Sequence, residues 1–208
     1  MTKVRDLDQL LDVAARLFGE LGYEATTLER IAQELGILKG SLYHYISSKA
    51  ELHSLVTGRR LAMLVDEVAA IAKLDLPADE RLERALRAHL GTIDEFHPES
   101  SQWFVQPAPP RQGATNPSAD LNRRYERILN RIVDDGVAAG LFRSDLDSQV
   151  ATLSVLGSCN WMTRWYRQGG RLSIDQIADS IIALSLAGLR ATGAPIEGTQ
   201  PALLTSSN

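Results

Sequence analysis

The chain has 208 residues, a length that allows one large domain or two small ones. Hydrophobic residues make up 44% of the chain, which is enough for a packed core, and 22 basic residues stand against 26 acidic ones. This balance excludes a protein coated with positive charge that packs nucleic acid without specificity, although it leaves room for a local binding surface.

No uninterrupted apolar run is long enough to cross a bilayer, and the first residues, MTKVRDLDQLL, lack the apolar segment of a secretory signal. The single cysteine, Cys159, cannot form an internal disulfide, and no cysteine pair suggests a zinc site. We therefore expect a cytoplasmic protein that has no membrane partner and binds no metal or cofactor.

Apolar residues follow helical spacing through nearly the whole chain, and no segment alternates convincingly as a strand would. The fold is therefore predicted to be all-α. A first helix occupies residues 10–21 and ends at Gly22. Thr26 and Glu29 have the spacing of a capping box, which predicts the start of a second helix that Gly36 ends.

The stretch KGSLYHYISSKAEL, from Lys39 to Leu52, predicts a very short third helix followed by a long one. Ser48 and Glu51 repeat the capping-box spacing, so the long helix is expected to begin just after Ser48. It continues toward residue 74, where the chain approaches Pro77, which interrupts the helical pattern.

Later helices are predicted over residues 79–95, 119–139, 146–167 and 174–192, with a loop rich in proline and glycine over residues 106–118. Ser173 and Gln176 supply a third capping box. The predicted domains are a helix-turn-helix domain over residues 1–48, a helical ligand-binding and dimerisation domain over residues 49–192, and a flexible tail over residues 193–208.

Two short helices joined by a tight turn form a helix-turn-helix unit, whose second helix can enter the major groove of DNA. Leu42 and Ile46 lie one turn apart and are expected to face the core, so Lys39, Tyr43 and His44 point outward. Small residues at positions 40 and 41 allow close approach to a surface. Ordinary surface residues of a helical protein would give a similar pattern, because helix-turn-helix spacing alone is weakly specific.

Residues 10–56 resemble the DNA-binding domain of the TetR family of bacterial transcription regulators, through AARLFGELGYEATTLERIAQELGI and KGSLYHYISSKAEL. The resemblance implies a homodimeric, all-helical regulator whose C-terminal domain senses a small molecule. It implies DNA contacts at Thr27, Lys39, Gly40, Ser41, Tyr43, His44 and Lys49. The chain departs from the usual pattern at Leu38, where family members carry a capping Ser or Thr, and at Ile46, where they carry Phe.

Aromatic residues outside the helix-turn-helix are the best candidates for a ligand site, and Arg164 beside them suits an organic anion with an apolar body. The candidates are Trp103, Phe104, Tyr125, Trp161, Arg164 and Trp165. Core or dimer packing is the alternative role for each tryptophan. The segment NWMTRWYRQGGRLS resembles a stretch of TetR-family regulators that respond to acyl-coenzyme A thioesters, which suggests such an effector or a related lipid-derived acid.

The last two predicted helices each carry an apolar stripe that includes a glycine, which allows close approach of a second helix. The stripes predict a dimer interface made by Leu153, Gly157, Ile177, Ile181, Leu184 and Gly188. The alternative is that they pack within their own domain. A dimer would hold two recognition helices about one turn of DNA apart, roughly 34 Å.

We find no nucleophile elbow, phosphate-binding glycine loop or HExxH motif in the sequence, and the four histidines show no metal-ligand spacing. A catalytic role is therefore the weakest interpretation. The sequence predicts a ligand-responsive repressor that binds a palindromic operator in double-stranded DNA as a homodimer and is released by a small-molecule effector. The alternative function is a helical carrier of lipid or acyl-coenzyme A, or an adaptor, that does not bind DNA.

Overall fold

The computed structural model describes residues 7–95 and 117–191, and regular structure in these ranges is helical throughout. The α-helices are α1 (Leu7–Leu21), α2 (Leu28–Glu34), α3 (Lys39–Leu42), α4 (Lys49–Ile71), α5 (Ala78–Glu95), α7 (Pro117–Ala138), α8 (Ser148–Trp161) and α9 (Ile174–Leu189), and a 3-10 turn, η1, spans Met162–Arg164. The predicted all-α fold is confirmed. Trp103, Phe104 and most of the predicted loop over residues 106–118 lie outside the described residues.

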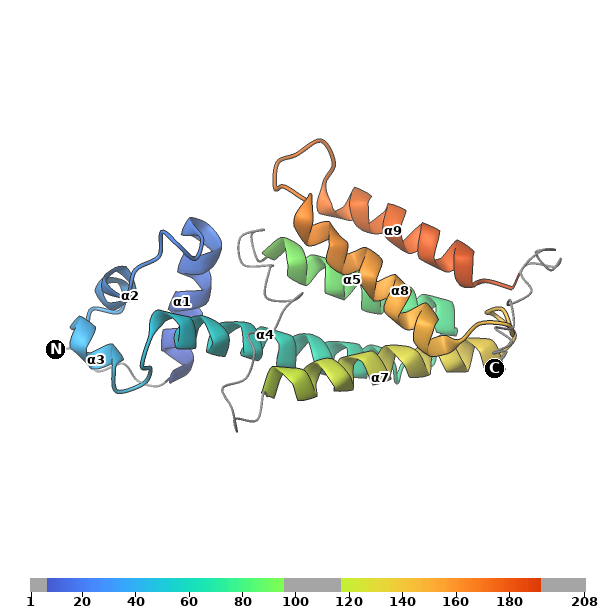
Figure 1. The fold of residues 1–208 in the computed structure, drawn as a ribbon, viewed down its shortest axis with the longest axis horizontal. Coiled ribbons are helices and arrows are strands. Elements are labelled where there is room, and N and C mark those ends of the chain that lie inside the picture. The colour runs from blue at the N-terminus through green and yellow to red at the C-terminus, as the bar shows by residue number, and fades with distance from the viewer. Residues whose placement is uncertain (1–6, 96–116, 192–208) are drawn as a thin grey trace, which may run out of the picture.

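One long helix, α4, runs from the N-terminal group of short helices into the C-terminal group (Figure 1). The helices α1, α2 and α3 gather around its beginning, and α7 lies along its second half. The helices α5, α8 and α9 pack on the other side of α4 and α7. The molecule is therefore a small head and a larger helical body joined by α4.

The head forms because apolar residues at helical spacing in α1 and α2 pack against the buried side chains of Leu42 and Ile46, in and just after α3. Leu42 and Ile46 are 0% and 3% exposed, as their one-turn spacing predicted. Gly22 and Gly36 have φ angles of 80° and 65°, a left-handed conformation that glycine adopts without strain. These two glycines follow the ends of α1 and α2, as the sequence predicted, and Gly36 lies in the tight turn of the helix-turn-helix.

The predicted cap of α2 is wrong by one residue. Thr27 is the N-cap, and its hydroxyl oxygen accepts a hydrogen bond from the backbone N–H of Arg30. Thr26 is fully buried instead, and its hydroxyl donates to the backbone carbonyls of Leu17 and Gly22. The Thr26 side chain therefore ties the end of α1 to the start of α2, a role that local spacing cannot distinguish from capping.

At the start of α4, Ser48 is the N-cap and accepts from the N–H of Glu51, as expected. The Glu51 carboxylate, however, accepts hydrogen bonds from the backbone and hydroxyl of Ser47, so the reciprocal half of the box is shifted by one residue. The third predicted box is complete, since Ser173 and Gln176 each satisfy a backbone donor of the other.

Two apolar clusters make the core, and α4 contributes to both. Leu52 and Val56 belong to the cluster of the head, whereas Leu61 and every later buried residue of α4 belong to the cluster of the body. The division between clusters therefore falls inside α4. The predicted domain boundary at residue 48 stays a prediction, because a continuous helix gives no break at which to place it.

The helix predicted over residues 146–167 is shorter than expected. The α8 helix ends at Trp161, a 3-10 turn follows, and Trp165 adopts a non-helical conformation. Met162 and Tyr166 are nearly fully buried, and the Tyr166 hydroxyl donates to the Asp94 carboxylate. The 3-10 turn is therefore followed closely by a residue, Tyr166, that is anchored to α5 through Asp94.

Replacing Gly136 with Ala should destabilise the body by roughly 1–3 kcal/mol, the usual cost of overpacking. An added Cβ at this buried position of α7 would lie 3.0 Å or less from three atoms of the Phe142 ring. Gly91→Ala is the matched control, because nothing lies within 4 Å of the new Cβ in α5. The control should gain up to about 1 kcal/mol from helix propensity. Urea unfolding measures both, and equal stability of the two variants would contradict the expectation.

Candidate DNA interface and effector cavity

One face of the helix-turn-helix carries exposed polar and aromatic side chains on a very short recognition helix. Gly40 and His44 are exposed, Tyr43 is 51% exposed and Ser41 is half-buried, while Leu42 beneath them is completely buried. This is the division of faces that the sequence predicted. The exposed side can approach the phosphates and base edges of a major groove without disturbing the core.

Leu38 is the N-cap of α3 and is 64% exposed, with no side-chain hydrogen bond to the helix. A Ser or Thr at this position would satisfy one of the first backbone donors, which is worth about 1 kcal/mol. The recognition helix of this chain therefore begins with an uncapped turn and an apolar side chain on its outer surface.

Lys39 forms an ion pair with Glu29 across the turn between α2 and α3. The hydrogen bond with Lys39 lowers the pKa of the Glu29 carboxyl below its ordinary value, and the same bond raises the pKa of the Lys39 ammonium. Both groups are exposed, so the pair is worth little to folding. Lys39 remains fully charged and can exchange Glu29 for a DNA phosphate.

Lys49 is held by contacts that the sequence did not reveal. Its ammonium group lies 4.2 Å from the centroid of the Tyr23 ring and donates to the carbonyl of Glu24 over 3.3 Å. Tyr23 in turn packs against the rings of Phe18 and His53 at centroid distances of 5.7 and 4.8 Å. An aromatic ring that attracts a cation fixes its position. The aromatic cluster therefore holds the ammonium group of Lys49 in one place beside the start of α4.

Thr27, the remaining residue predicted to contact DNA, is exposed at the start of α2, where its hydroxyl oxygen accepts the capping bond. The structure thus brings the predicted DNA-contacting residues onto the exposed surface of α2, α3 and the start of α4. The contacts themselves stay predictions. Among residues 7–95 and 117–191 no group of His, Cys, Asp and Glu could hold a metal ion.

A buried hydrogen-bond chain crosses the body of the protein from α7 through α5 to α8. The Tyr125 hydroxyl lies 3.0 Å from Nδ1 of His89, and Nε2 of His89 lies 3.1 Å from Oδ1 of Asn160. Because an amide oxygen accepts only, Nε2 carries the proton, and Nδ1 then accepts from Tyr125. Burial of His89 lowers its pKa to about 4, so the ring is neutral at physiological pH.

This chain of side chains borders a cavity of about 90 Å³. Its lining comes from α4, α5, α7 and α8, namely Leu61, Leu64, His89, Asn122, Tyr125, Glu126, Leu156 and Asn160. Tyr125 is thus the predicted ligand-site residue that the structure places at a cavity. The sequence could show that His89 lies among apolar residues of a helix, but its partners are 36 and 71 residues away along the chain.

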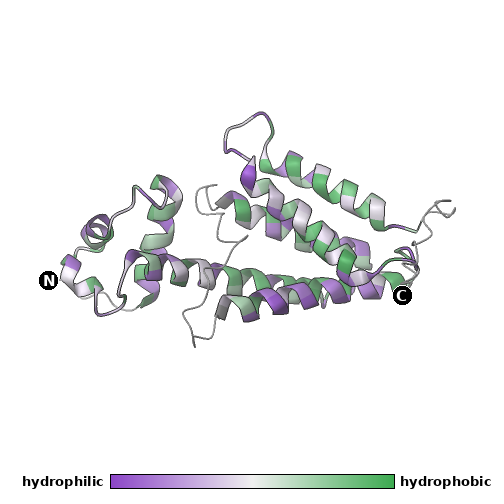
Figure 2. Ribbon diagram, in the orientation of Figure 1, coloured by the Kyte–Doolittle hydropathy of each residue, from purple (hydrophilic) through white to green (hydrophobic). Residues whose placement is uncertain are grey.

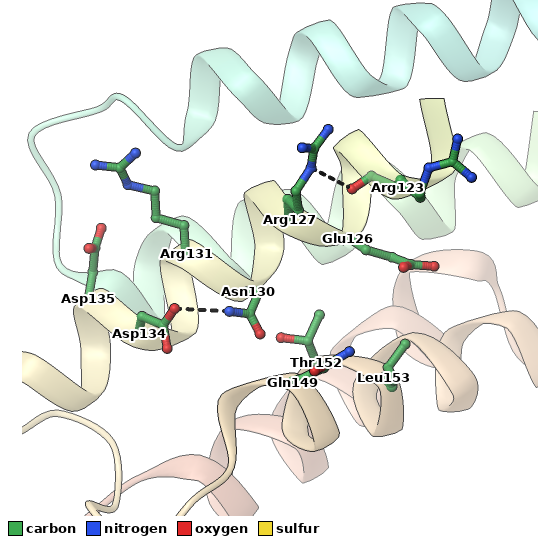
Figure 3. A pocket seen from close by; sticks show the side chains of 10 residues that line it. All are labelled: Arg123, Glu126, Arg127, Asn130, Arg131, Asp134, Asp135, Gln149, Thr152 and Leu153. Carbon is green, nitrogen blue, oxygen red and sulfur yellow. Dashed lines mark hydrogen bonds between the residues drawn. The ribbon is translucent and has the colours of Figure 1, made fainter. Parts of the chain in front are cut away.

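A larger groove of about 820 Å³ lies between α7 and α8, and Glu126 lines both this groove and the small cavity. In Figure 3, Asn130 of α7 and Thr152 of α8 face one another across it, while the Arg123, Arg127 and Arg131 side chains follow one side of α7. The groove is large enough for a sizeable polar group, and sequence spacing gave no sign of it.

The three ligand-site candidates near the end of α8 lie on the surface. Trp161 and Trp165 are 63% and 49% exposed, and the guanidinium of Arg164 sits 5.6 Å from the centroid of the Trp161 ring. None of the three lines the cavity or the groove. The structure therefore does not bring them together with Tyr125, and their assignment to ligand binding stays a prediction.

The outer faces of α8 and α9 carry apolar side chains that are exposed in the part of the chain that the structure describes. Leu153 and Leu184 are 48% and 76% exposed, and Gly157 and Gly188 lie on the same exposed faces. Hydrophobic colouring extends along both helices in Figure 2. Ile181 is half-buried, and Ile177 is 4% exposed and belongs to the core of its own domain. Ile177 therefore offers little area to a second chain.

A helix-turn-helix joined by a long helix to an α-helical domain with a cavity is the architecture of a ligand-responsive DNA-binding regulator. The model of bacterial regulatory proteins of the tetR family matches residues 10–54, and the tetracyclin repressor-like C-terminal domain matches residues 75–189. The chain belongs to the TetR family of bacterial transcription regulators.

Individual relatives agree with this family. The chain is 33% identical over 184 residues to the HTH-type transcriptional repressor KstR2 of Rhodococcus jostii strain RHA1. The alignment covers 87% of this chain and 89% of that protein. A TetR/AcrR regulator from Thermobifida fusca is 32% identical with a TM-score of 0.73, over 88% of this chain and 98% of that one. The ketosteroid transcriptional regulator KstR2 of Mycobacterium tuberculosis is 27% identical with a TM-score of 0.64, over 89% and 95% respectively.

Stability should fall as the pH drops from 6.5 toward 4, because burial lowers the pKa of both His53 and His89 to about 4. The unfolded chain takes up protons on these histidines below 6.5, whereas the folded chain does not until about 4. Their contribution is therefore fully present above 6.5 and is lost across this window.

Urea unfolding at several pH values measures the effect, and the His53→Phe variant is the comparison. Phenylalanine can keep the ring contacts of His53 with Phe18 and Tyr23 but binds no proton. The variant should show a shallower loss of unfolding free energy across the same window. Identical slopes for the two proteins would contradict the assignment to His53.

Proposed function

We propose that this protein is a homodimeric transcriptional repressor that binds a palindromic operator and is released by a small hydrophobic effector of the acyl-coenzyme A type. The observation that carries the proposal is the continuity of α4. Lys49 at its beginning belongs to the surface that we propose to face DNA, and Leu61 and Leu64 further along form part of the cavity wall. A single helix thus connects the two candidate sites.

The relatives support a lipid-derived effector. The Mycobacterium tuberculosis protein is a ketosteroid regulator by name, and the Rhodococcus jostii protein is a named repressor. A large apolar ligand suits the body of this chain, whose cavity wall includes Leu61, Leu64 and Leu156. The groove beyond Glu126, with its arginines, offers room for the polar end of the same molecule.

The size of the cavity supports coupling between the two sites. At about 90 Å³ it is well below the roughly 300–1,000 Å³ of typical ligand pockets. An effector can therefore enter only if the wall moves. Displacement of Leu61 and Leu64 moves α4, and the recognition helices of a dimer then lose the half-site spacing. Coupling of this kind is typically worth 1–3 kcal/mol.

The exposed stripes of α8 and α9 support dimer formation through a four-helix bundle, with Leu153, Gly157, Leu184 and Gly188 at its centre. No helix within residues 7–95 and 117–191 is long and apolar enough to span a membrane. A non-enzymatic role in the cytoplasm fits a DNA-binding regulator. The predicted division into domains at residues 48 and 192 is part of the same proposal.

The experiment that tests the function is an electrophoretic mobility shift with DNA from upstream of the gene for this protein, with and without a panel of acyl-coenzyme A thioesters. A shift that one thioester releases supports the repressor and its effector class. A shift that no thioester releases would support operator binding but contradict an effector of the acyl-coenzyme A type. Ligand binding without any shift would favour the carrier.

Replacing both Tyr43 and Lys49 with Ala should abolish operator binding while the dimer stays folded, because both side chains are exposed or partly exposed at the DNA surface. Lys49→Ala alone should reduce the salt dependence of binding by about one phosphate contact. Lys73→Ala is the matched control, since this exposed lysine lies just beyond the other end of α4. Fluorescence anisotropy across a salt series measures all three, and operator binding by the double variant would refute the proposed docking surface.

Leu64→Ala should weaken the coupling between effector and operator. The smaller side chain enlarges the cavity on the α4 side, so an effector can enter with less displacement of the helix. We expect effector affinity to be kept or increased while the ratio of operator affinities without and with effector decreases. Leu82→Ala is the control, because Leu82 is equally buried but does not line the cavity. If both variants change the ratio equally, the effect comes from lost stability and not from the cavity wall.

A further inference from the structure

The hydrogen-bond chain in the body leaves one strong donor available at the cavity. Oδ1 of Asn160 faces Nε2 of His89 and accepts its hydrogen bond, so the amide nitrogen points away from the imidazole. Within residues 7–95 and 117–191 the amide nitrogen of Asn160 donates to no protein group. Asn160 lines the cavity, so its N–H groups can serve an acceptor that enters there.

The charges around the cavity decide which kind of acceptor is stable. Among residues 7–95 and 117–191, no Lys or Arg belongs to the lining, and Glu126 is the one acidic residue there. His89 is buried and stays uncharged, because burial lowers its pKa to about 4. A carboxylate in this cavity would therefore lose its hydration without meeting a cation, which is far more costly than burying a neutral carbonyl that receives a hydrogen bond.

We propose that the cavity binds an uncharged carbonyl group of the effector through the amide of Asn160 and rejects a free carboxylate. Tyr125 and His89 are positioning residues that act through Asn160. The volume of about 90 Å³ holds roughly three waters, which is room for a carbonyl and a few carbon atoms before the walls move. This inference rests on the proposed function and specifies which part of the effector enters the cavity, namely an uncharged carbonyl such as that of a thioester, an ester or a ketone.

The test is direct binding of matched probes to the full-length protein in the absence of DNA. Straight-chain carboxylic acids of increasing length are compared with their methyl esters at neutral pH by isothermal titration calorimetry. Each ester should bind at least tenfold more tightly than the acid of the same length. An acid that binds as tightly as its ester, or no binding of any ester, overturns the proposal.

Two variants distinguish the role of the Asn160 amide donor from that of the positioning residue Tyr125. Asn160→Asp keeps the shape and an acceptor for His89 but removes the amide donors, so ester affinity should fall at least tenfold. Tyr125→Phe keeps the ring stacked on His89, whose centroid lies 5.6 Å away, and removes only the hydroxyl. It should cost less than Asn160→Asp and leave the preference for ester over acid intact. Unchanged ester affinity in Asn160→Asp, with its folding verified by circular dichroism, refutes the role of the amide.

The preference of the unmodified protein decides the proposal even if Asn160→Asp does not fold. Because these titrations contain no DNA, they are independent of operator release. Esters that bind with the expected preference but release no operator would contradict the proposed function and leave the cavity assignment standing. Operator release by an acid that binds in the cavity as tightly as its ester would support the proposed regulator and contradict the preference of the cavity for an uncharged carbonyl.

Discussion

The rigidity of α4 is the constraint on which the rest of the molecule depends. Its 23 residues give a helix about 35 Å long at 1.5 Å per residue, and both apolar clusters are built on it. Arg59 ties the helix to the Asp8 and Asp12 side chains of α1, and Asp66 pairs with Arg124 of α7. Because both clusters are built on one continuous helix, α4 is the element through which we propose that movement at the cavity wall reaches the head.

Polar groups are used differently in the two halves. In the head, Lys39 and Lys49 lie at the surface. Lys39 is restrained by Glu29 and Lys49 by the ring of Tyr23, partners that DNA can replace or share. In the body, His89 is neutral and fully committed to hydrogen bonds. This difference is consistent with our proposals that the surface binds phosphate and that the interior binds an uncharged polar group of an apolar ligand.

The outer faces of α8 and α9 complete this arrangement. Exposed leucines at positions 153 and 184, beside glycines at positions 157 and 188, give a surface that can be desolvated with close helix approach. These helices also pack on the body that contains the cavity. A dimer formed there would hold two α4 helices in a fixed relation, which is what a palindromic operator requires of its two recognition helices.

The sequence by itself determined the all-α fold, the glycine turns and the buried face of the recognition helix, because helical periodicity and left-handed glycines are local properties. It also marked the exposed face that carries Tyr43 and His44. Tertiary structure alone decided that Thr26 is buried and Thr27 caps, that Tyr23 holds Lys49, and that Tyr125, His89 and Asn160 meet. It also placed Trp161 at the surface, whereas Tyr125 lines the cavity. These outcomes depend on contacts between residues far apart in the chain, which spacing along one helix cannot encode.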